Sequence, residues 1–316
     1  MGMVIEQIKK LITAHLAKTP EGKIPLIVIL GPTAVGKTAL SIKLAKEYKG
    51  EVISADSRQV YKSMDIGTDK ISMSERSLVP HHMLDVVNPD EEFSVYDFKV
   101  ACEQLISEIC ARGHVPFLVG GTMLYIDAVT KNFDFGGVPP DENLRNKLQE
   151  FLKEKGKEAL REKLRKLDPE TAEKIHQNNT HYVLRAIEKA TSRAKAEGKA
   201  ASQCSQHVLK IGLIRQRKEI YDRINLRVDA QMKDGKLEAE AKVMIEKYGT
   251  EVHSITGLGY RQFIPYFNHE IKADGKEYNL DDVKNRLQKD TRNFAKRQLS
   301  WWRKDDQIHW FDVSDS

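Results

Sequence analysis

The residues with the clearest chemical potential form one short run near the N-terminus. The run satisfies the pattern Gly-x-x-x-x-Gly-Lys-[Ser/Thr] and consists of Gly31, Pro32, Thr33, Ala34, Val35, Gly36, Lys37 and Thr38. The glycines let the backbone curl so that successive N–H groups point at phosphate oxygens, while Lys37 adds a positive charge and the Thr38 hydroxyl can hold Mg²⁺. Such a P-loop most often binds ATP or GTP. The alternative is a glycine-rich turn that contains Lys-Thr by chance.

The segments on either side of this run decide between the two interpretations. An apolar run at 24–30 precedes it and is typical of a buried strand, and residues 39–48 follow with a helical pattern. A strand before and a helix after form the setting in which this pattern binds phosphate. The flanking elements therefore favour a phosphate site.

Short β-rich runs alternate with helical patterns along much of the chain. They predict strands at 25–30, 51–55, 82–87, 115–119, 208–214 and 308–313. Strands separated by helices predict an α/β fold of the P-loop NTPase-like kind, with a mostly parallel sheet and helices on both faces. The strand at 115–119 lacks the terminal Asp with which P-loop ATPases position Mg²⁺ and water, which weakens an ATPase interpretation.

Three parts of the chain differ in pattern. Residues 1–23 predict a helical extension because apolar residues recur at helical spacing. Residues 136–205 contain no strand-like run and read as a helical insertion rich in charge. Residues 24–135 and 206–316 then form the α/β core, and the core ends in basic helices.

Composition excludes several classes of protein. Three cysteines without a paired CxxC spacing support neither a zinc site nor a disulfide framework, and they fit reduced thiols in a cytoplasmic protein. The longest apolar run has about seven residues, far short of the roughly 20 of a membrane helix, so we expect no membrane association. We expect a monomer.

The net charge of +5 does not by itself indicate a polyanionic partner, but the basic residues are unevenly placed. Residues 284–304 hold eight Lys and Arg against the single acid Asp290. Spacings of three and four place Lys289, Arg292 and Lys296 on one helix face. This face is either an RNA contact or a solvated helix surface.

Further motifs follow the P-loop in a fixed order. They lie at 53–61 (Ile-Ser-Ala-Asp-Ser-Arg-Gln-Val-Tyr), 64–68 (Met-Asp-Ile-Gly-Thr), 79–85 and 120–125 (Gly-Gly-Thr-Met-Leu-Tyr), and shorter ones at 168–169, 175–176, 185–186, 217–224, 257–260, 291–292 and 296–299. The series resembles the bacterial tRNA dimethylallyltransferases, also called tRNA isopentenyltransferases, from about residue 25 to 304. Ordered motifs over nearly the whole chain are far more specific than a P-loop alone.

The resemblance implies a reaction. A dimethylallyl group passes from dimethylallyl diphosphate to the exocyclic amine (N6) of the adenosine just 3′ of the tRNA anticodon, giving N6-isopentenyladenosine. The P-loop would then hold the departing diphosphate with Mg²⁺ on Thr38, and Lys37 would stabilise the growing charge. Arg217 and Arg223 match family arginines that face the diphosphate. Without the resemblance they read as solvated charges on a helix.

Two further residues match catalytic positions of the family. An adenine amine is a poor nucleophile, so its attack becomes easier if a base takes a proton. Asp56 matches the proposed general base, although an acid near this position assists Mg²⁺ in many P-loop enzymes. Thr122 matches a threonine that hydrogen-bonds near the reacting amine and diphosphate, and simple helix N-capping is its alternative.

The resemblance also assigns tRNA contacts. Asp56 and Thr122 lie at the target base, and the remaining positions are Ser57, Arg58, Gln59, Arg145 and Arg185. The helical insertion would bind the anticodon arm. Where many relatives carry an arginine upstream of Arg185, this chain has Tyr182 and departs from the family pattern. The other functions left open are a P-loop kinase of a nucleotide or small metabolite and a non-catalytic RNA-binding NTPase.

Overall fold

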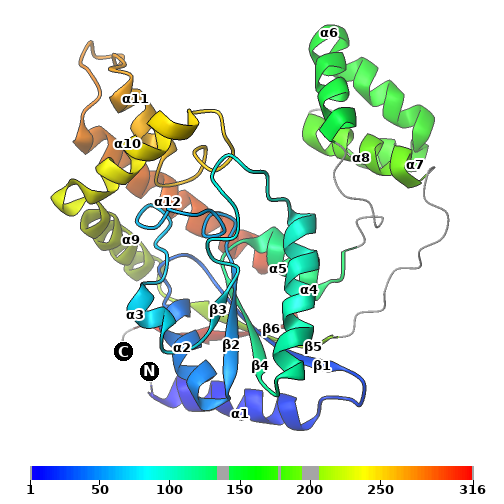
Figure 1. Ribbon diagram of the computed structural model, residues 1–316, viewed down its shortest axis with the longest axis vertical. Helices are drawn as coiled ribbons and strands as arrows, with labels where there is room; N and C mark the ends of the chain where they lie inside the picture. Colours follow the sequence, from blue (N-terminus) through cyan, green and yellow to red (C-terminus); the bar gives the residue numbers. More distant parts are fainter. Residues whose placement is uncertain (1, 134–141, 177–178, 194–205, 315–316) are drawn as a thin grey trace. The chain divides into compact units, whose positions relative to one another are not determined.

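The computed structural model describes residues 2–133, 142–176, 179–193 and 206–314 (Figure 1). The chain divides into two compact units. Unit 1 combines Met1–Lys131 with Ser205–Ser316, and unit 2 is Asn132–Cys204. Unit 2 covers nearly the same residues as the predicted insertion at 136–205, whose two borders fall outside the described residues.

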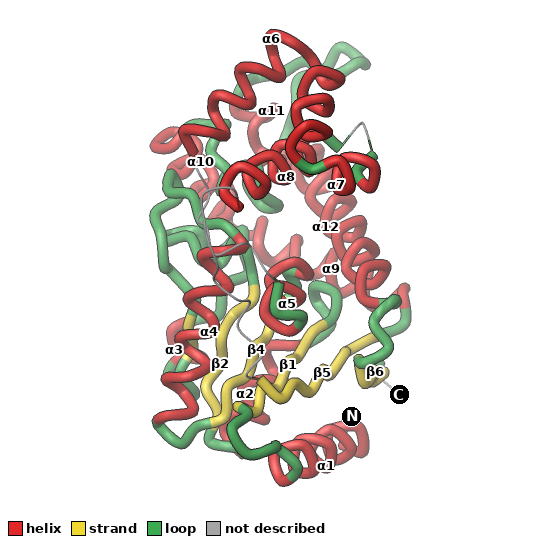
Figure 2. The backbone as a smooth tube through the Cα atoms, turned by 90° about the vertical axis from the view of Figure 1, so that its right-hand side faces the viewer, coloured by secondary structure: helices red, strands yellow, loops and turns green. Residues whose placement is uncertain are grey.

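Unit 1 is built on a sheet of six strands. The strands are β1 (Ile24–Leu30), β2 (Gly50–Ala55), β3 (His81–His82), β4 (Val115–Gly120), β5 (Gln206–Ile214) and β6 (Ile308–Asp312). Their order is β3-β2-β4-β1-β5-β6, and every neighbouring pair is parallel. Figure 2 shows β2, β4, β1, β5 and β6 side by side in this order. The predicted α/β fold is confirmed.

The prediction for the third strand was wrong in length. A strand was expected at 82–87, but β3 ends at His82. Met83 and Asp85 have φ angles of 62° and 56°, which lie in the left-handed region and stop the strand. Apolar alternation does not reveal a left-handed residue, so the pattern carried the predicted strand too far.

Helices cover both faces of the sheet, as predicted. One core contains α1 (Gly2–Ala17), α2 (Lys37–Glu47) and α9 (Arg217–Met232), and the other contains α4 (Val95–Ala111) and α5 (Met123–Thr130). Strand β1 is buried on both sides because Ile27 and Ile29 enter the first core and Leu26 and Val28 the second. Ile8 and Ile12 of α1 are buried, which confirms an amphipathic N-terminal helix.

A third core lies among the helices that follow β5. It is formed by α10 (Lys236–Tyr248), η2 (Arg261–Phe263), α11 (Ile264–Phe267) and α12 (Leu280–Trp302), together with α9. The short helix η1 (Lys233–Gly235) connects α9 to α10. Val60, Tyr61 and Met64, which follow β2, are buried in the same core. Short helix α3 (Met73–Arg76) comes later in this connection. Helices far along the sequence therefore support the loop after β2.

The described part of unit 2 is helical. It contains α6 (Glu142–Leu167), α7 (Pro169–Lys174) and α8 (Thr180–Arg193), and Leu148, Leu160 and Ile187 are buried among its core residues. Gly156 interrupts α6 with φ 81° and ψ 178°. None of the helices in the described parts of either unit has the length and apolar character needed to cross a membrane.

Candidate active site

A cavity of about 790 Å³ opens at the end of the sheet where β1, β2 and β4 finish. The P-loop after β1, the turn 56–59 after β2 and the turn 120–122 after β4 line it. Arg223 and Arg227 from α9 and Arg297 from α12 complete a positively charged wall. All lining residues belong to unit 1. The carboxyl ends of parallel strands are where open α/β sheets bind ligands.

The P-loop has the curled backbone that its pattern predicts. Gly31 and Gly36 have φ angles of 145° and 108°, and a Cβ on Gly31 would lie 2.6 Å from the carbonyl oxygen of Leu213. Helix α2 begins at Lys37, so the N–H groups of its first turn have no acceptor within the helix. These donors and the positive end of the helix form a cradle for an anion.

Lys37 is held inside the cradle. Its ammonium donates to the carbonyl oxygens of Gly31 at 3.0 Å and Pro32 at 2.9 Å. Burial lowers the pKa of Lys37 to about 8, although the charge of Asp56 raises it. The amine is therefore mostly charged at neutral pH, and its side chain lines the cavity, where a phosphate-binding lysine must lie.

Two arginines hold the P-loop from α9 and the end of β5. Arg215 Nε donates to the Val35 carbonyl oxygen at 3.1 Å, and Arg223 Nε donates to that of Ala34 at 2.8 Å. The structure thus brings the predicted Arg223 to the cavity. Arg217 is exposed and is not among the lining residues, and its Nε donates to the Tyr221 hydroxyl at 3.0 Å. That Arg217 binds diphosphate stays a prediction.

Gln298 of α12 is a buried residue of the site to which the sequence assigned no role. Its Oε1 accepts the N–H of Thr33 at 2.8 Å, and its Nε2 donates to the Gly121 carbonyl oxygen at 2.8 Å. One side chain therefore joins the P-loop to the turn after β4. Gln298 lies in the motif at 296–299, but nothing in a single sequence indicates this bridge.

The side chains of Thr122 and Asp56 both accept backbone N–H groups of the turn at 57–59. Thr122 is the N-cap residue of α5, but its side chain makes no capping hydrogen bond, and its Oγ1 accepts the N–H of Ser57 at 2.9 Å. The helix-capping alternative is therefore excluded. Asp56 Oδ1 accepts the N–H groups of Arg58 at 2.9 Å and Gln59 at 3.4 Å. These bonds fix the orientation of the Asp56 carboxylate at the cavity.

The side chains of Arg58 and Gln59 line the cavity and also bind the protein itself. Arg58 donates to the carbonyl oxygens of His253 and, at 3.4 Å, Ser254. Gln59 Nε2 donates to the carbonyl oxygen of Thr68 at 3.2 Å, and its Oε1 accepts from Ser54 Oγ at 3.0 Å. Both side chains therefore organise the loop after β2. Their contact with tRNA stays a prediction.

Two predicted tRNA contacts lie in unit 2 and share one carboxylate. Arg145 Nε donates to Glu188 at 2.9 Å, and Arg185 donates to the same carboxylate at 2.6 Å. Burial alone would raise the pKa of Glu188, but the hydrogen bonds from both arginines outweigh it and lower the pKa. Tyr182, the departure from the family pattern, is 61% exposed. That Arg145 and Arg185 contact tRNA stays a prediction.

A magnesium ion at the P-loop would need more ligands than one hydroxyl supplies, and a bound phosphate would provide them. Among the residues that the structure describes, no three His, Cys, Asp or Glu side chains lie close enough to hold a metal ion by themselves. Thr38 lines the cavity from the first turn of α2. Mg²⁺ usually takes few protein ligands and keeps water and phosphate oxygens, so one hydroxyl beside a phosphate site suits it.

Comparison with known proteins identifies the family. A family model described as IPP transferase matches residues 59–305, and a second, described as isopentenyl transferase, matches residues 24–90. The chain belongs to the IPP transferase family. Its resemblance to this family, inferred from ordered motifs, is therefore confirmed.

Named relatives and relatives of known structure match almost the full chain. The tRNA dimethylallyltransferase of Halothermothrix orenii is 44% identical over 296 residues, which cover 92% of this chain and 88% of that protein. The crystal structure of the full-length tRNA isopentenylpyrophosphate transferase from Bacillus halodurans gives a TM-score of 0.68 at 41% identity, covering 93% of this chain and 91% of that one. A eukaryotic dimethylallyltransferase acting on tRNA gives 0.76 at 30% identity, covering 92% and 74%.

Proposed function

We propose that this IPP transferase family member transfers a dimethylallyl group from dimethylallyl diphosphate to N6 of the adenosine 3′ of a tRNA anticodon. The products are N6-isopentenyladenosine in tRNA and diphosphate. The observation that carries the proposal is that the anion cradle and the side chains of Asp56 and Thr122 line one cavity. Family membership supplies the reaction class.

The cradle acts on the leaving group. As the C–O bond of the allyl diphosphate breaks, negative charge grows on the diphosphate oxygens. That charge is stabilised by donors whose positions are set before the reaction. These donors are Lys37, Arg223 and the first N–H groups of α2. Mg²⁺ held by Thr38 would add a further positive charge to the diphosphate.

The turn after β2 acts on the nucleophile. The N6 lone pair forms the new bond to the allyl carbon while the C–O electron pair leaves with diphosphate, and Asp56 takes the proton that N6 loses. Thr122 holds the backbone of Ser57 and thereby places Asp56 beside the cradle. The alternative role for Asp56, assistance to Mg²⁺, predicts loss of diphosphate affinity when its charge is removed.

The target adenine enters this cavity after it has left the base stack of the anticodon loop. Extrusion of a base costs a few kcal/mol and is easiest in a single-stranded loop. In this proposal Asp56, Ser57, Arg58, Gln59 and Thr122 surround the adenine and its neighbours. Unit 2, with Arg145 and Arg185, binds the anticodon arm, and the basic face of α12 follows the backbone. Because the substrate is tRNA, the proposal places the reaction in the cytoplasm.

A labelled-substrate assay tests the proposal. The protein and Mg²⁺ are incubated with unmodified tRNA and either labelled dimethylallyl diphosphate or ATP labelled in its terminal phosphate. We expect label in tRNA only from dimethylallyl diphosphate, and none when the target adenosine is replaced by guanosine. Label in tRNA from ATP alone would show phosphoryl transfer instead of prenyl transfer, and hydrolysis of ATP without transfer would support an RNA-binding NTPase. Either result would contradict the proposal.

A further inference from the structure

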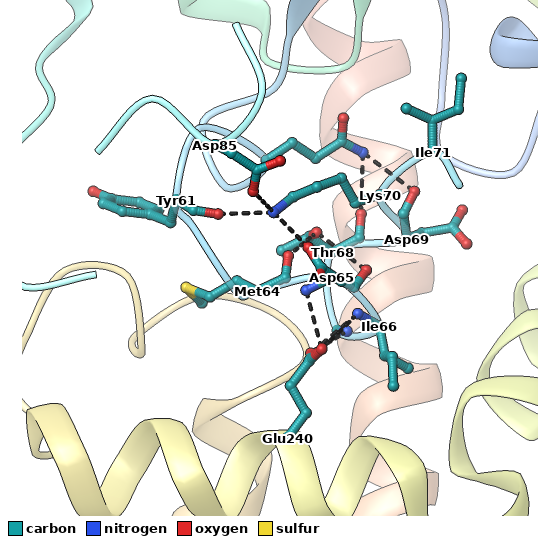
Figure 3. Close-up of polar contacts among 12 residues, drawn as sticks. Tyr61, Met64, Asp65, Ile66, Thr68, Asp69, Lys70, Ile71, Asp85 and Glu240 are labelled. Carbon is teal, nitrogen blue, oxygen red and sulfur yellow. Dashed lines mark hydrogen bonds and ion pairs between the residues drawn. The ribbon is translucent and has the colours of Figure 1, made fainter. Parts of the chain in front are cut away.

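One carboxylate from α10 holds the far end of the loop after β2. The backbone N–H groups of Asp65, Ile66 and Gly67 all donate to Glu240, at 3.0, 2.9 and 2.9 Å (Figure 3). Three successive N–H groups that converge on one anion form a nest. Hydrogen bonds to an ionised carboxylate are stronger than those between neutral groups. Glu240 therefore anchors residues 65–67, a segment distant from it in sequence.

Tyr260 completes the anchor. Its hydroxyl donates to Glu240 Oε1 at 2.7 Å, and its ring is fully buried. Burial and the neighbouring Glu240 carboxylate raise the pKa of Tyr260, so the hydroxyl keeps its proton and stays a donor. Glu240 thus accepts from four donors, three on the loop and one on the neighbouring turn.

Steric contacts leave the anchored segment no room to move toward that turn. A Cβ on Gly67 would lie 2.7 Å from Tyr260 Cζ. Gly259, with φ 99°, lies so close that a Cβ on it would be 2.5 Å from the Gly67 carbonyl oxygen. The two glycines therefore allow the backbones of both segments to touch.

The buried side chain of Lys70 also holds this segment in place through hydrogen bonds. Its side chain is 1% exposed, and its ammonium donates to the Tyr61 carbonyl oxygen at 2.8 Å and to the carboxylates of Asp65 and Asp85 at 2.7 Å each (Figure 3). Burial of a charge costs free energy unless it is paired, and here two carboxylates pair it. Lys70 and Glu240 therefore fix the segment between them.

The anchored segment reaches the site through Gln59. Gly67, Thr68 and Asp69 line the cavity, whereas Glu240 does not. Gln59 Nε2 donates to the carbonyl oxygens of Thr68 at 3.2 Å and Asp69 at 3.3 Å, and its N–H donates to Asp56 Oδ1 at 3.4 Å. A displacement of residues 65–69 would therefore move the groups that orient Asp56.

We propose that Glu240 is a positioning residue of the reaction. By holding the N–H groups of 65–67 it fixes the cavity wall at 67–69 and, through Gln59, the orientation of Asp56 toward the adenine amine. This inference rests on the proposed function and adds to it a residue that touches neither substrate. An error of about 1 Å in the position of a catalytic group can lower a rate by about 10²-fold.

Glu240→Gln tests the inference. The variant keeps the size of the side chain, but its amide NH₂ faces backbone donors and leaves one oxygen as acceptor. We expect kcat for prenyl transfer to fall about 10- to 100-fold, because Asp56 loses its orientation. The KM for dimethylallyl diphosphate should stay within about twofold, since Glu240 hydrogen-bonds to residues 65–67 and Tyr260 rather than to the P-loop. Amide hydrogen exchange at 65–67, followed without substrate, should become about tenfold faster or more.

Two matched variants separate positioning from general destabilisation. Glu238→Gln changes the same helix, where the Glu238 carboxylate accepts from the Tyr266 hydroxyl at 3.1 Å, and it should leave kcat and exchange within about twofold. Tyr260→Phe removes one of the four donors to Glu240 and should lower kcat by only about threefold. It serves as the second test if Glu240→Gln does not fold.

The outcomes are distinct. Unchanged kcat in Glu240→Gln, or an equal fall in kcat in Glu238→Gln, would overturn the inference. A slow exchange at 65–67 in Glu240→Gln would also overturn it, because the anchor would then not depend on the carboxylate. Absence of prenyl transfer by the unaltered protein would instead contradict the proposed function, while the exchange measurement would still report on the anchor.

Discussion

Residues 65–67 and the start of α2 both present successive backbone N–H groups to an anion, and the two regions differ in the source of that anion. At residues 65–67 the anion is the carboxylate of Glu240. At the start of α2 the N–H groups face the cavity, and among the described residues no carboxylate hydrogen-bonds to them. Successive N–H groups therefore stabilise the fold where the protein supplies the anion, and we propose that they bind the ligand where it does not.

Asp56 lines the same cavity as the P-loop and is linked through Gln59 to residues 68–69. Removal of its charge should have the largest effect on activity. In Asp56→Asn the side chain keeps an acceptor for the N–H of Arg58 but loses the charge that takes the proton. We expect kcat to fall about 10³-fold with tRNA affinity unchanged. Single-turnover transfer and tRNA filter binding measure the two quantities. A matching loss of diphosphate affinity would favour the magnesium role instead.

Lys37→Met should weaken the binding of the developing diphosphate charge at the P-loop. Loss of one charged donor to a developing anion costs about 10²- to 10³-fold in kcat, and we expect the lower part of that range. Because burial lowers the pKa of Lys37 to about 8, the free enzyme loses this charge as pH rises past 8, and kcat/KM for dimethylallyl diphosphate should decline there. Lys37→Arg should remove that decline. A decline that persists in Lys37→Arg would assign it to another group.

Gln298→Met tests the P-loop, because Gln298 accepts the N–H of Thr33 within the cradle. The variant loses the bonds to Thr33 and Gly121, worth about 1 kcal/mol each. We expect kcat/KM for dimethylallyl diphosphate to fall about tenfold as the P-loop moves away from the turn after β4. Steady-state kinetics at saturating tRNA measure the change. An effect confined to the KM for tRNA would argue against this bridge.

The Glu51 carboxylate is paired with cationic and histidine side chains away from the cavity, so its substitution should have the smallest effect on activity. Burial would raise the pKa of Glu51, but hydrogen bonds from Arg112, His82 and His114 outweigh it and lower the pKa to about 2. The ionised carboxylate therefore stabilises the fold above its unfolded pKa, and this stability is lost as pH falls from about 4.5 toward 2.

Glu51→Gln tests this assignment. We expect the variant to lose about 2 kcal/mol of unfolding free energy at pH 7, less at pH 3, with kcat unchanged. Urea unfolding at both pH values checks the expectation. A loss that is equal at pH 3 and pH 7 would show that the charge of Glu51 does not contribute.

The sequence predicted the fold where local patterns determine it. Five strands appear within two residues of their predicted bounds because apolar runs bury in a parallel sheet, and the P-loop has the predicted backbone. The strand through 87 failed because Met83 and Asp85 adopt left-handed conformations. The basic stretch does form helix α12, but Lys284 pairs with Asp229 at 2.8 Å and Arg292 bonds Asn225 at 2.6 Å, so part of that stretch contacts α9. Its contact with RNA stays a prediction.

The partners of individual side chains were beyond prediction from one sequence. Gln298 and Glu240 act on segments more than 170 residues away, and no spacing rule connects them to those segments. A motif reveals an anion site that the chain leaves open, because the ligand requires particular residue types nearby. An anion site filled by a distant carboxylate leaves no such local pattern.

Amide hydrogen exchange of the unaltered protein compares the two N–H sites most directly. Exchange is followed at 36–39 and at 65–67, with Mg²⁺, before and after saturation with inorganic diphosphate. The account predicts that diphosphate slows exchange at 36–39 by about tenfold or more, while 65–67 is slow under both conditions. Unchanged exchange at 36–39, or diphosphate-dependent protection at 65–67, would contradict the account.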